Sequence, residues 1–357
     1  MGKRATAGAC LEALVKMAVP LLQEAERQCP RTGPGAKPTI PDWLIGVLIM
    51  VAVLKRKKTK AAQWRFITDP ANRARLAAAL GRNDFPSRSR WYDRYRRAQG
   101  LFQVAIRLQG QRAIDEGLAD PRHLAADKSL IEAHGPRWHK RDRERGKVPA
   151  GVDRDSTWSY SKHDGWVQGF SYEVVVSATK HTLVFPLLAS VDTASAAEVR
   201  TFRDKIAHLP AGAKTVSLDS GYDASYLGEE VEWDGRGKRT GRRFLCPENP
   251  RGGPHRPTSN SHHTVRQRRS RALKAERQKF LKGSYARRLY SRRKKTVEPF
   301  NQWFKSLFEL DLKVWHRGLH NNQTQILASV FSYQLLVRFN HRCGRKNGRV
   351  RWIMDAL

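Results

Sequence analysis

The stretch GFSYEVVVSATKHTLVFPLLASVD, residues 169–192, decides the fold class. It contains two runs rich in Val, Leu, Phe and Tyr, and polar residues separate these runs around Thr179 to Thr182. Short β-branched and aromatic runs bounded by polar residues are typical of strands. The stretch therefore predicts two β-strands joined by a turn.

The neighbouring segments extend this pattern. HLAADKSLIEAHG (123–135) has the composition of a short strand, and AKTVSLDSGYD (213–223) predicts a strand that ends in a Ser-Gly turn. RRFLCPEN (242–249) favours one more strand, whereas SAAEVRTFRDKIAHLP (195–210) has helical spacing and stops at its proline. Strands and helices in this order predict a mixed α/β fold.

The chain before this sheet has a helical period from Cys10 to about Gln111. Its longest apolar run, WLIGVLIMVAVL (43–54), is well short of the ~20 residues that a bilayer span needs. The run therefore predicts a buried helix, which Pro41 opens as a first-turn proline. We expect a helical N-terminal region at residues 1–115.

A basic segment, LGRNDFPSRSRWYDRYRRAQG (80–100), closes this region. Ser87 is suited to cap a helix, and Trp91 and Tyr95 alternate with arginines at helical spacing. The pattern predicts a helix laid on DNA with its apolar side inward and its arginines outward, and an ordinary solvated basic helix is the alternative. The candidate DNA-binding residues here are Arg88, Arg90, Arg94 and Arg97.

The overall charge indicates the class of partner. The 357 residues include 67 Lys and Arg against 33 Asp and Glu, a net charge of +34, and the 40% hydrophobic content suffices for a large core. Such an excess is typical of proteins that bind a polyanion, so nucleic acid is the first expectation. An anionic membrane surface competes less well, because no long basic amphipathic helix lies beside an anchor.

Four cysteines are far apart and form no CxxC pair, so neither a zinc site nor a disulfide framework is expected. The N-terminus carries charge but no secretory apolar core, and we expect a cytoplasmic protein.

Residues 228–283 are rich in Gly, Pro and Ser and predict a loose basic insertion. Residues 266–295 contain fourteen Arg and Lys against one acid, Glu276, which favours a phosphate track over a solvated face. An apolar helix at QILASVFSYQLLVRF (325–339) and a basic tail at 346–357 end the chain. The sheet-containing domain is expected at residues 116–345.

Three acids in this basic chain are candidates for phosphodiester chemistry, which two Mg²⁺ ions ~3.5–4 Å apart can support when carboxylates hold them. Asp127 lies inside an apolar strand pattern, and Asp219 follows one at its carboxyl end. Taken singly, Asp127 could pair with a cation and Asp219 could cap a turn. Asp192 has a similar setting, but DTASAAE reads as a helix start that includes Glu198, so we assign Asp192 to capping.

The third acid, Glu298, is the one carboxylate in YSRRKKTVEPFNQWFK (290–305). An ion pair on a surface helix is the plain explanation. In a helix, Glu298 shares a face with Asn301, Gln302 and Lys305, and Pro299 either starts or bends that helix. The apolar stripe that would pack on the sheet is Val297, Phe300, Phe304 and Leu307.

These acids, in this order, resemble those of the DDE transposases of bacterial insertion sequences, and the resemblance runs from about Leu80 to Phe339. AADKSLIEAHG resembles the first-strand motif of that group, GWVQGFSYEVVVSAT the following strands, SLDSGYD the second-aspartate motif, and FPSRSRWYDRYRR the helical region before the catalytic core. YSRRKKTVEPFNQWFK resembles the Tyr-Arg-Glu-Lys signature, and Lys305 matches its lysine. Seven residues, not six, separate Tyr290 from Glu298, which sets Tyr290 and Arg293 apart from the family pattern.

The resemblance implies an RNase H-like mixed sheet flanked by helices, in which Asp127, Asp219 and Glu298 are catalytic and bind two Mg²⁺ ions, with Mn²⁺ as an alternative. It implies nicking of transposon ends and joining of the freed 3′-hydroxyl to target DNA. Double-stranded DNA, as terminal inverted repeats and as target, is then the partner, with a homodimer in the synaptic complex and a nucleoid-associated bacterial location. Tyr290, Arg293 and Lys305 join the DNA-binding candidates. The alternatives are a metal-dependent nuclease without strand transfer and a catalytically inactive DNA-binding derivative.

Overall fold

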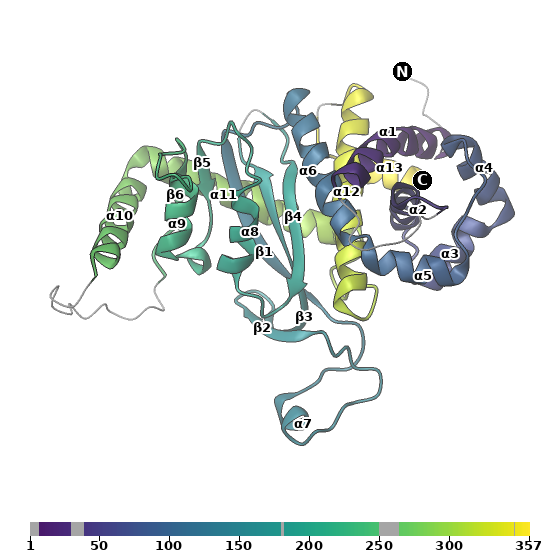
Figure 1. Cartoon of the computed structure of the whole chain (residues 1–357), viewed down its shortest axis with the longest axis horizontal. Coiled ribbons are helices and arrows are strands. Elements are labelled where there is room, and N and C mark those ends of the chain that lie inside the picture. Colours follow the sequence, from purple (N-terminus) through teal and green to yellow (C-terminus); the bar gives the residue numbers. More distant parts are fainter. Residues whose placement is uncertain (1–6, 30–38, 180–181, 250–263, 346) are drawn as a thin grey trace.

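The computed structural model describes residues 7–29, 39–179, 182–249, 264–345 and 347–357 (Figure 1). Helices precede, flank and follow one six-stranded sheet in this part of the chain. The helices are α1 Ala7–Gln28, α2 Asp42–Leu54, α3 Lys60–Thr68, α4 Pro70–Leu80, α5 Arg88–Arg97, α6 Gln99–Asp115, α7 Lys140–Glu144, α8 Glu198–Ile206, the 3₁₀ turn η1 Ser220–Tyr222, α9 Ser225–Glu232, α10 Val265–Lys282, α11 Ser284–Leu307, α12 Leu319–Arg342 and α13 Arg351–Ala356. The strands are β1 His123–Glu132, β2 Thr157–Ser161, β3 Gly165–Ser177, β4 Pro186–Thr193, β5 Thr215–Ser217 and β6 Arg243–Leu245.

The sheet is mixed. Strand β3 pairs antiparallel with β1 on one side and with β2 and β4 on the other, whereas β5 and β6 continue parallel to β1. The two strands predicted in residues 169–192 are present. Part of the predicted turn, Lys180 and His181, lies outside the described residues, and the hydroxyls of Thr179 and Thr182 that flank it are 2.7 Å apart. The prediction of an RNase H-like mixed sheet flanked by helices and preceded by a helical region is confirmed.

Helices cover both faces of the sheet. Tyr172 of β3 points toward α11, where its ring lies 5.3 Å from that of Phe304. The next residue, Glu173, points to the opposite face and contacts α8 through Thr201 and Lys205. This alternation along β3 assigns α11 to one face and α8 to the other.

The N-terminal helices and the sheet share one hydrophobic core, which runs from Cys10 to Met354. Helix α12 joins the two parts, because nearly all of its residues from 322 to 340 are buried and it contacts α1, α2, α5 and α6 as well as β3 and β4 (Figure 1). The side-chain amide of Gln334 donates to Ile106 O in α6 and to Pro186 O in β4. The apolar run in α2 is buried from Leu44 to Leu54, as predicted.

Helix α5 differs from the expectation in one respect. Ser87 caps it as predicted, by accepting a hydrogen bond from the Arg90 amide, and Trp91 and Tyr95 are buried. Arg94 does not point outward. Its guanidinium donates to the Asp42 carboxylate and to Ile40 O, so Arg94 ties α5 to the start of α2. Pro41 is the N-cap of α2 and not a first-turn residue.

The predicted loose insertion and the predicted basic tail both contain regular structure. Residues 228–283 include most of α9, strand β6 and the 18-residue α10, while residues 250–263 lie outside the described part. The expected basic tail at 346–357 contains α13, whose Ile353 and Met354 are buried. Apolar anchor residues in each segment provide the packing that the polar composition conceals. Over the described ranges, no helix is long and apolar enough to cross a membrane.

Candidate active site

The register of two parallel strands brings Asp127 and Asp219 side by side. Ala125 of β1 pairs with Ser217 of β5, so each aspartate lies two residues beyond the same rung of the sheet. Strand β5 ends there, whereas β1 continues to Glu132, which leaves this edge of β1 without a neighbouring strand. The carboxyl ends of parallel strands commonly form ligand sites for this reason.

Helix α11 brings Glu298 to the same place. Val297, Phe300 and Phe304 of its apolar stripe are buried, as predicted. The helix continues through Pro299, which has no amide hydrogen to donate to the carbonyl of Lys295. The predicted polar face lines a cavity together with Asp127 and Asp219, and its residues are Glu298, Asn301, Gln302 and Lys305.

Arg293 lies among the three acids. Its guanidinium is 2.7 Å from Asp127 Oδ1, 3.1 Å from Glu298 Oε1 and 3.7 Å from Asp219 Oδ2. The Arg293 side chain is only 8% exposed, whereas Asp219 and Glu298 are 40% and 47% exposed. One cation therefore holds three carboxylates together, and the cluster keeps an excess of negative charge.

Asn301 and Lys305 complete this side of the cavity. The Asn301 amide donates to Asp127 Oδ2 at 3.1 Å, while its own Oδ1 is buried without a hydrogen-bond partner. The Lys305 ammonium donates to Leu130 O of β1 at 2.7 Å. Burial lowers the pKa of Lys305, and nearby acids, Asp164 first, oppose that shift.

Burial raises the pKa of Asp127 to about 6. Arg293 opposes this shift, while the carboxylates of Asp219 and Glu298 add to it. Because two neighbouring carboxylates contribute to the raised pKa, an added cation beside Asp127 would favour its ionised form.

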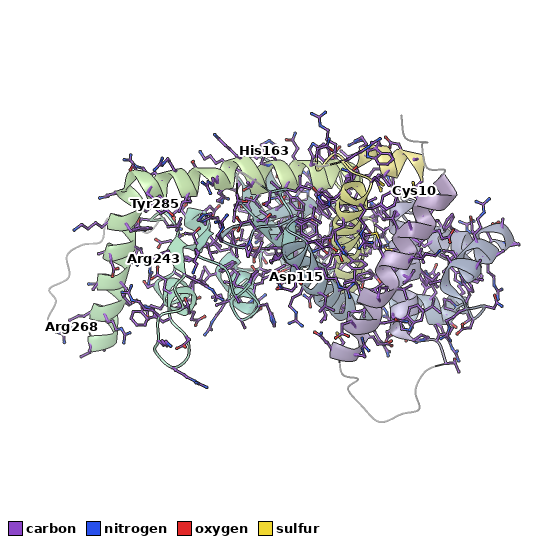
Figure 2. All side chains as sticks on the ribbon, turned by 90° about the horizontal axis from the view of Figure 1, so that it is seen from above. Cys10, Asp115, His163, Arg243, Arg268 and Tyr285 are labelled. Atoms are coloured by element: carbon purple, nitrogen blue, oxygen red, sulfur yellow. The ribbon has the colours of Figure 1, made fainter. Side chains whose placement is uncertain are left out.

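The cavity has a volume of about 1000 Å³. Its walls come from β1, the hairpin at residues 159–164, the start of α8, the turn at 219–221 and α11. Figure 2 shows α11 along one edge of the molecule. Tyr285 is labelled near the start of this helix, and His163 of the hairpin is labelled further along it. The cavity is large enough to admit a nucleic-acid strand.

A family model described as transposase DDE domain matches residues 118–335, which contain all three acids. The chain belongs to the DDE transposases. No curated protein matches it in a sequence comparison. The membership implies DNA binding and a transposase-type nuclease or transferase, and DDE transposases use divalent metal ions. The predicted family is confirmed.

The residues of this DDE transposase site fit a hard divalent cation by their chemistry. Three carboxylates and the unpartnered Asn301 Oδ1 are the oxygen ligands that Mg²⁺ prefers. Among the described residues, however, no three His, Cys, Asp or Glu side chains are already placed to hold a metal ion together. Arg293 stands between the acids, so ion binding requires its guanidinium to move.

The other predicted DNA-binding residues of the DDE transposase occupy two places. Arg88, Arg90 and Arg97 are exposed on α5. Tyr290 is half-buried and packs beside Ala286 and Leu289. Arg293 contacts carboxylates and its side chain is 8% exposed, and its role in DNA binding stays a prediction.

Sequence reasoning missed one acid that lines the cavity, Glu198. The sequence pattern places it with Asp192 at a helix start. In the structure Asp192 does not cap α8, because Ala197 is the N-cap residue, and Asp192 pairs with Arg200 at 2.8 Å. Glu198 faces the cavity from the first turn of α8. A signal was present in SLDSGYD, whose Gly221 leaves room for the Glu198 carboxylate.

Proposed function

We propose that this protein is a DNA transposase that nicks the ends of its element and joins the freed 3′-hydroxyl to target DNA. The observation that carries the proposal is the convergence of Asp127, Asp219 and Glu298 on one guanidinium beside an open cavity, inside a transposase DDE domain. In the first step water breaks a phosphodiester bond and leaves a 3′-hydroxyl. In the second step that hydroxyl displaces a 3′-oxygen of the target strand, so one phosphodiester bond forms as another breaks.

Asp127, Asp219 and Glu298 would hold two Mg²⁺ ions, with Mn²⁺ as a substitute. When bound, such ions lower the pKa of the attacking hydroxyl and absorb charge on the leaving oxygen. The chain's own residues do the positioning. Asn301 orients Asp127 through its amide, and Lys305 presents a cation to the cavity from its hydrogen bond with Leu130 O.

The exposed face of α11 suits a DNA strand that leads into the cavity. Arg287, Arg288, Lys294 and Lys295 are exposed, and they precede Glu298 by three to eleven residues along the helix. At ~1.5 Å per residue the helix from Arg287 to Glu298 covers roughly 16 Å, enough for two or three phosphates of one strand. The exposed arginines of α5 form a separate basic surface for the rest of the element end or for target DNA.

The test is a joining assay with purified protein, a labelled element end, Mg²⁺ and a supercoiled target. We expect cleaved ends and joined product, and we expect Asp219→Asn to reduce both by on the order of 10³-fold or more while binding the same DNA. Unchanged cleavage by Asp219→Asn would contradict the proposed site. Cleaved ends without joined product would favour the nuclease, and DNA binding without cleavage would favour the inactive derivative.

The DNA path has its own test. The pair Arg287→Gln and Arg288→Gln should weaken binding and lower the slope of log K against log salt by about 0.9 for each phosphate that the variant no longer binds. Arg112→Gln is the matched control, because Arg112 is exposed on α6, whose end at Asp115 lies away from α11 in Figure 2. Equal effects of the α11 pair and the control would argue against this path.

Synapsis of two element ends favours a homodimer. Sedimentation of the protein alone and with element-end DNA should show two chains with two ends. A complex that stays at one chain per end during joining would contradict this part of the proposal.

A further inference from the structure

Glu198 reaches the active site from the face of the sheet opposite α11. Its Oε2 lies only 2.1 Å from the point where a Cβ on Gly221 would stand, and Asp219 Oδ1 lies 3.0 Å from the same point. The two carboxylates therefore meet above the backbone of Gly221. Any side chain at position 221 would displace the Glu198 carboxylate.

Within the described ranges, the Glu198 side chain makes no hydrogen bond or ion pair with a protein group. The positive charge that acts on it is that of Lys128, but the Lys128 ammonium donates to Ala194 O at 2.8 Å and to Ala196 O at 2.6 Å. Asp192, close by in sequence, has a direct partner in Arg200. Glu198 is thus a half-buried carboxylate that faces another acid and lacks a direct counter-ion.

Such an arrangement is costly in the protein alone. A carboxylate that loses water needs a hydrogen-bond donor or a cation, and like charges nearby raise the cost. The first turn of α8 offers partial compensation through its helix dipole. Asn301 Oδ1, buried in the same cavity without a partner, is a second oxygen that lacks a cation or donor.

We propose that Glu198 is a fourth carboxylate of the active site, which acts with Asp219 to hold a divalent cation on the side of the cavity opposite Glu298. This inference rests on the proposed function and adds a residue to its site. Asp219 then has a carboxylate on either side, Glu198 from α8 and the Asp127 and Glu298 pair from the α11 side.

The rival explanation is local, that Glu198 only stabilises the N-terminus of α8. The two explanations differ in what they predict for metal binding. A residue that serves the helix should change the unfolding midpoint of the metal-free protein and leave ion affinity unchanged. A ligand should do the reverse, because removing a like charge beside Asp219 costs the metal-free fold little.

The experiment is a Mn²⁺ titration of the full-length, metal-free protein, followed by electron paramagnetic resonance of the free ion. Glu198→Gln should weaken Mn²⁺ binding by roughly 10–100-fold or remove one of two bound ions. Glu198→Asp, which keeps the charge on a shorter side chain, should have an intermediate effect. Asp204→Asn is the matched control, an exposed acid on the same helix, and should bind Mn²⁺ as the unsubstituted protein does.

The outcomes distinguish an error in the role of Glu198 from an error in the three-acid metal site. If Glu198→Gln binds Mn²⁺ normally while Asp219→Asn does not, the fourth carboxylate is wrong and the three-acid site stands. If Asp219→Asn also binds normally, the metal assignment of the proposed function fails. As a second readout, excess Mg²⁺ should restore cleavage by Glu198→Gln more fully than by Asp219→Asn, and equal restoration would count against the proposal.

Discussion

Two charged clusters lie on opposite faces of the same sheet and differ in how their charges are balanced. The buried network, made of Glu173, Thr201, Lys205 and Tyr222, contains one acid and one base. Glu173 Oε1 accepts from Lys205 at 2.6 Å, and its Oε2 accepts from Thr201 and Tyr222 at 2.8 Å each. The acid cluster, made of Asp127, Asp219, Glu298 and Arg293, contains three acids and one base.

The difference shows how to tell a structural ion pair from a functional one. In the buried network both carboxylate oxygens of Glu173 and the Lys205 ammonium have protein partners, so nothing further is needed. In the acid cluster the charge is unbalanced, Arg293 Nε has no partner, and neighbouring Asn301 Oδ1 has none either. Proteins tolerate such unsatisfied groups mainly where function requires them.

The largest expected effect concerns the buried network. Lys205→Met leaves the Glu173 carboxylate, 2% exposed, without its cation and should lower the free energy of unfolding by about 3–5 kcal/mol. Urea denaturation of the metal-free protein measures this loss. The double variant Lys205→Met with Glu173→Leu should recover part of it. A loss below about 1 kcal/mol would show that the ion pair between Lys205 and Glu173 contributes little to the stability of the fold.

Arg293→Gln tests the acid cluster in the same way. Removing the one base should destabilise the metal-free protein by about 1–3 kcal/mol, less than Lys205→Met, because Asp219 and Glu298 remain partly hydrated. Mg²⁺ should restore the stability of this variant but not that of Lys205→Met. Differential scanning calorimetry with EDTA and with Mg²⁺ measures the stability of both variants. If Mg²⁺ stabilised both equally, the acid cluster would not differ from the buried network in its need for a cation.

Tyr222→Phe removes one donor from the buried network and should cost about 1.5 kcal/mol, because Glu173 Oε2 keeps its bond from Thr201. The same urea titration measures it, with Tyr285→Phe as the control at an exposed tyrosine. A cost equal to that of Lys205→Met would mean that the hydroxyl, not the cation, stabilises Glu173.

The smallest effect is a pH dependence at Asp127, whose pKa is raised to about 6 by burial. The folded state holds this proton more tightly than the unfolded state. Protonation of Asp127 therefore stabilises the folded protein fully below about pH 4, and this contribution is lost as pH rises through about 6. Asp127→Asn, which cannot ionise, should therefore be about as stable as the unsubstituted protein at about pH 3.5 and more stable than it at pH 7.5, without metal. Unfolding midpoints at both pH values check this, and an opposite sign would contradict the raised pKa.

The sequence was sufficient where a pattern was local. The strands at residues 169–192, the buried helix at 43–54 and the apolar stripe of α11 follow from periodicity and composition. The order of the acids identified the family, which the match at residues 118–335 confirms.

Contacts between distant residues could not be predicted in this way. Arg293 donates to Asp127, which lies 166 residues earlier in the chain and is placed by the pairing of β1 with its neighbours. Arg94 donates to Asp42, which lies 52 residues earlier. Glu198 was missed because the start of a helix explains an acid at that position without reference to the neighbouring turn. Helix α10 was missed because its basic composition gives no apolar stripe. It packs partly through a basic residue, Arg277, which is buried and pairs with Glu232.

Helix α12 has a consequence for how the molecule can be divided. Its sides are covered by the N-terminal helices and by β4 together, so neither part has a complete apolar interior of its own. Recombinant fragments that end or begin near residue 115 would each expose apolar surface that is buried in the whole chain, and they would aggregate. The whole chain should melt in a single cooperative transition, and a destabilising substitution on either side of α12 should lower the stability of both parts together.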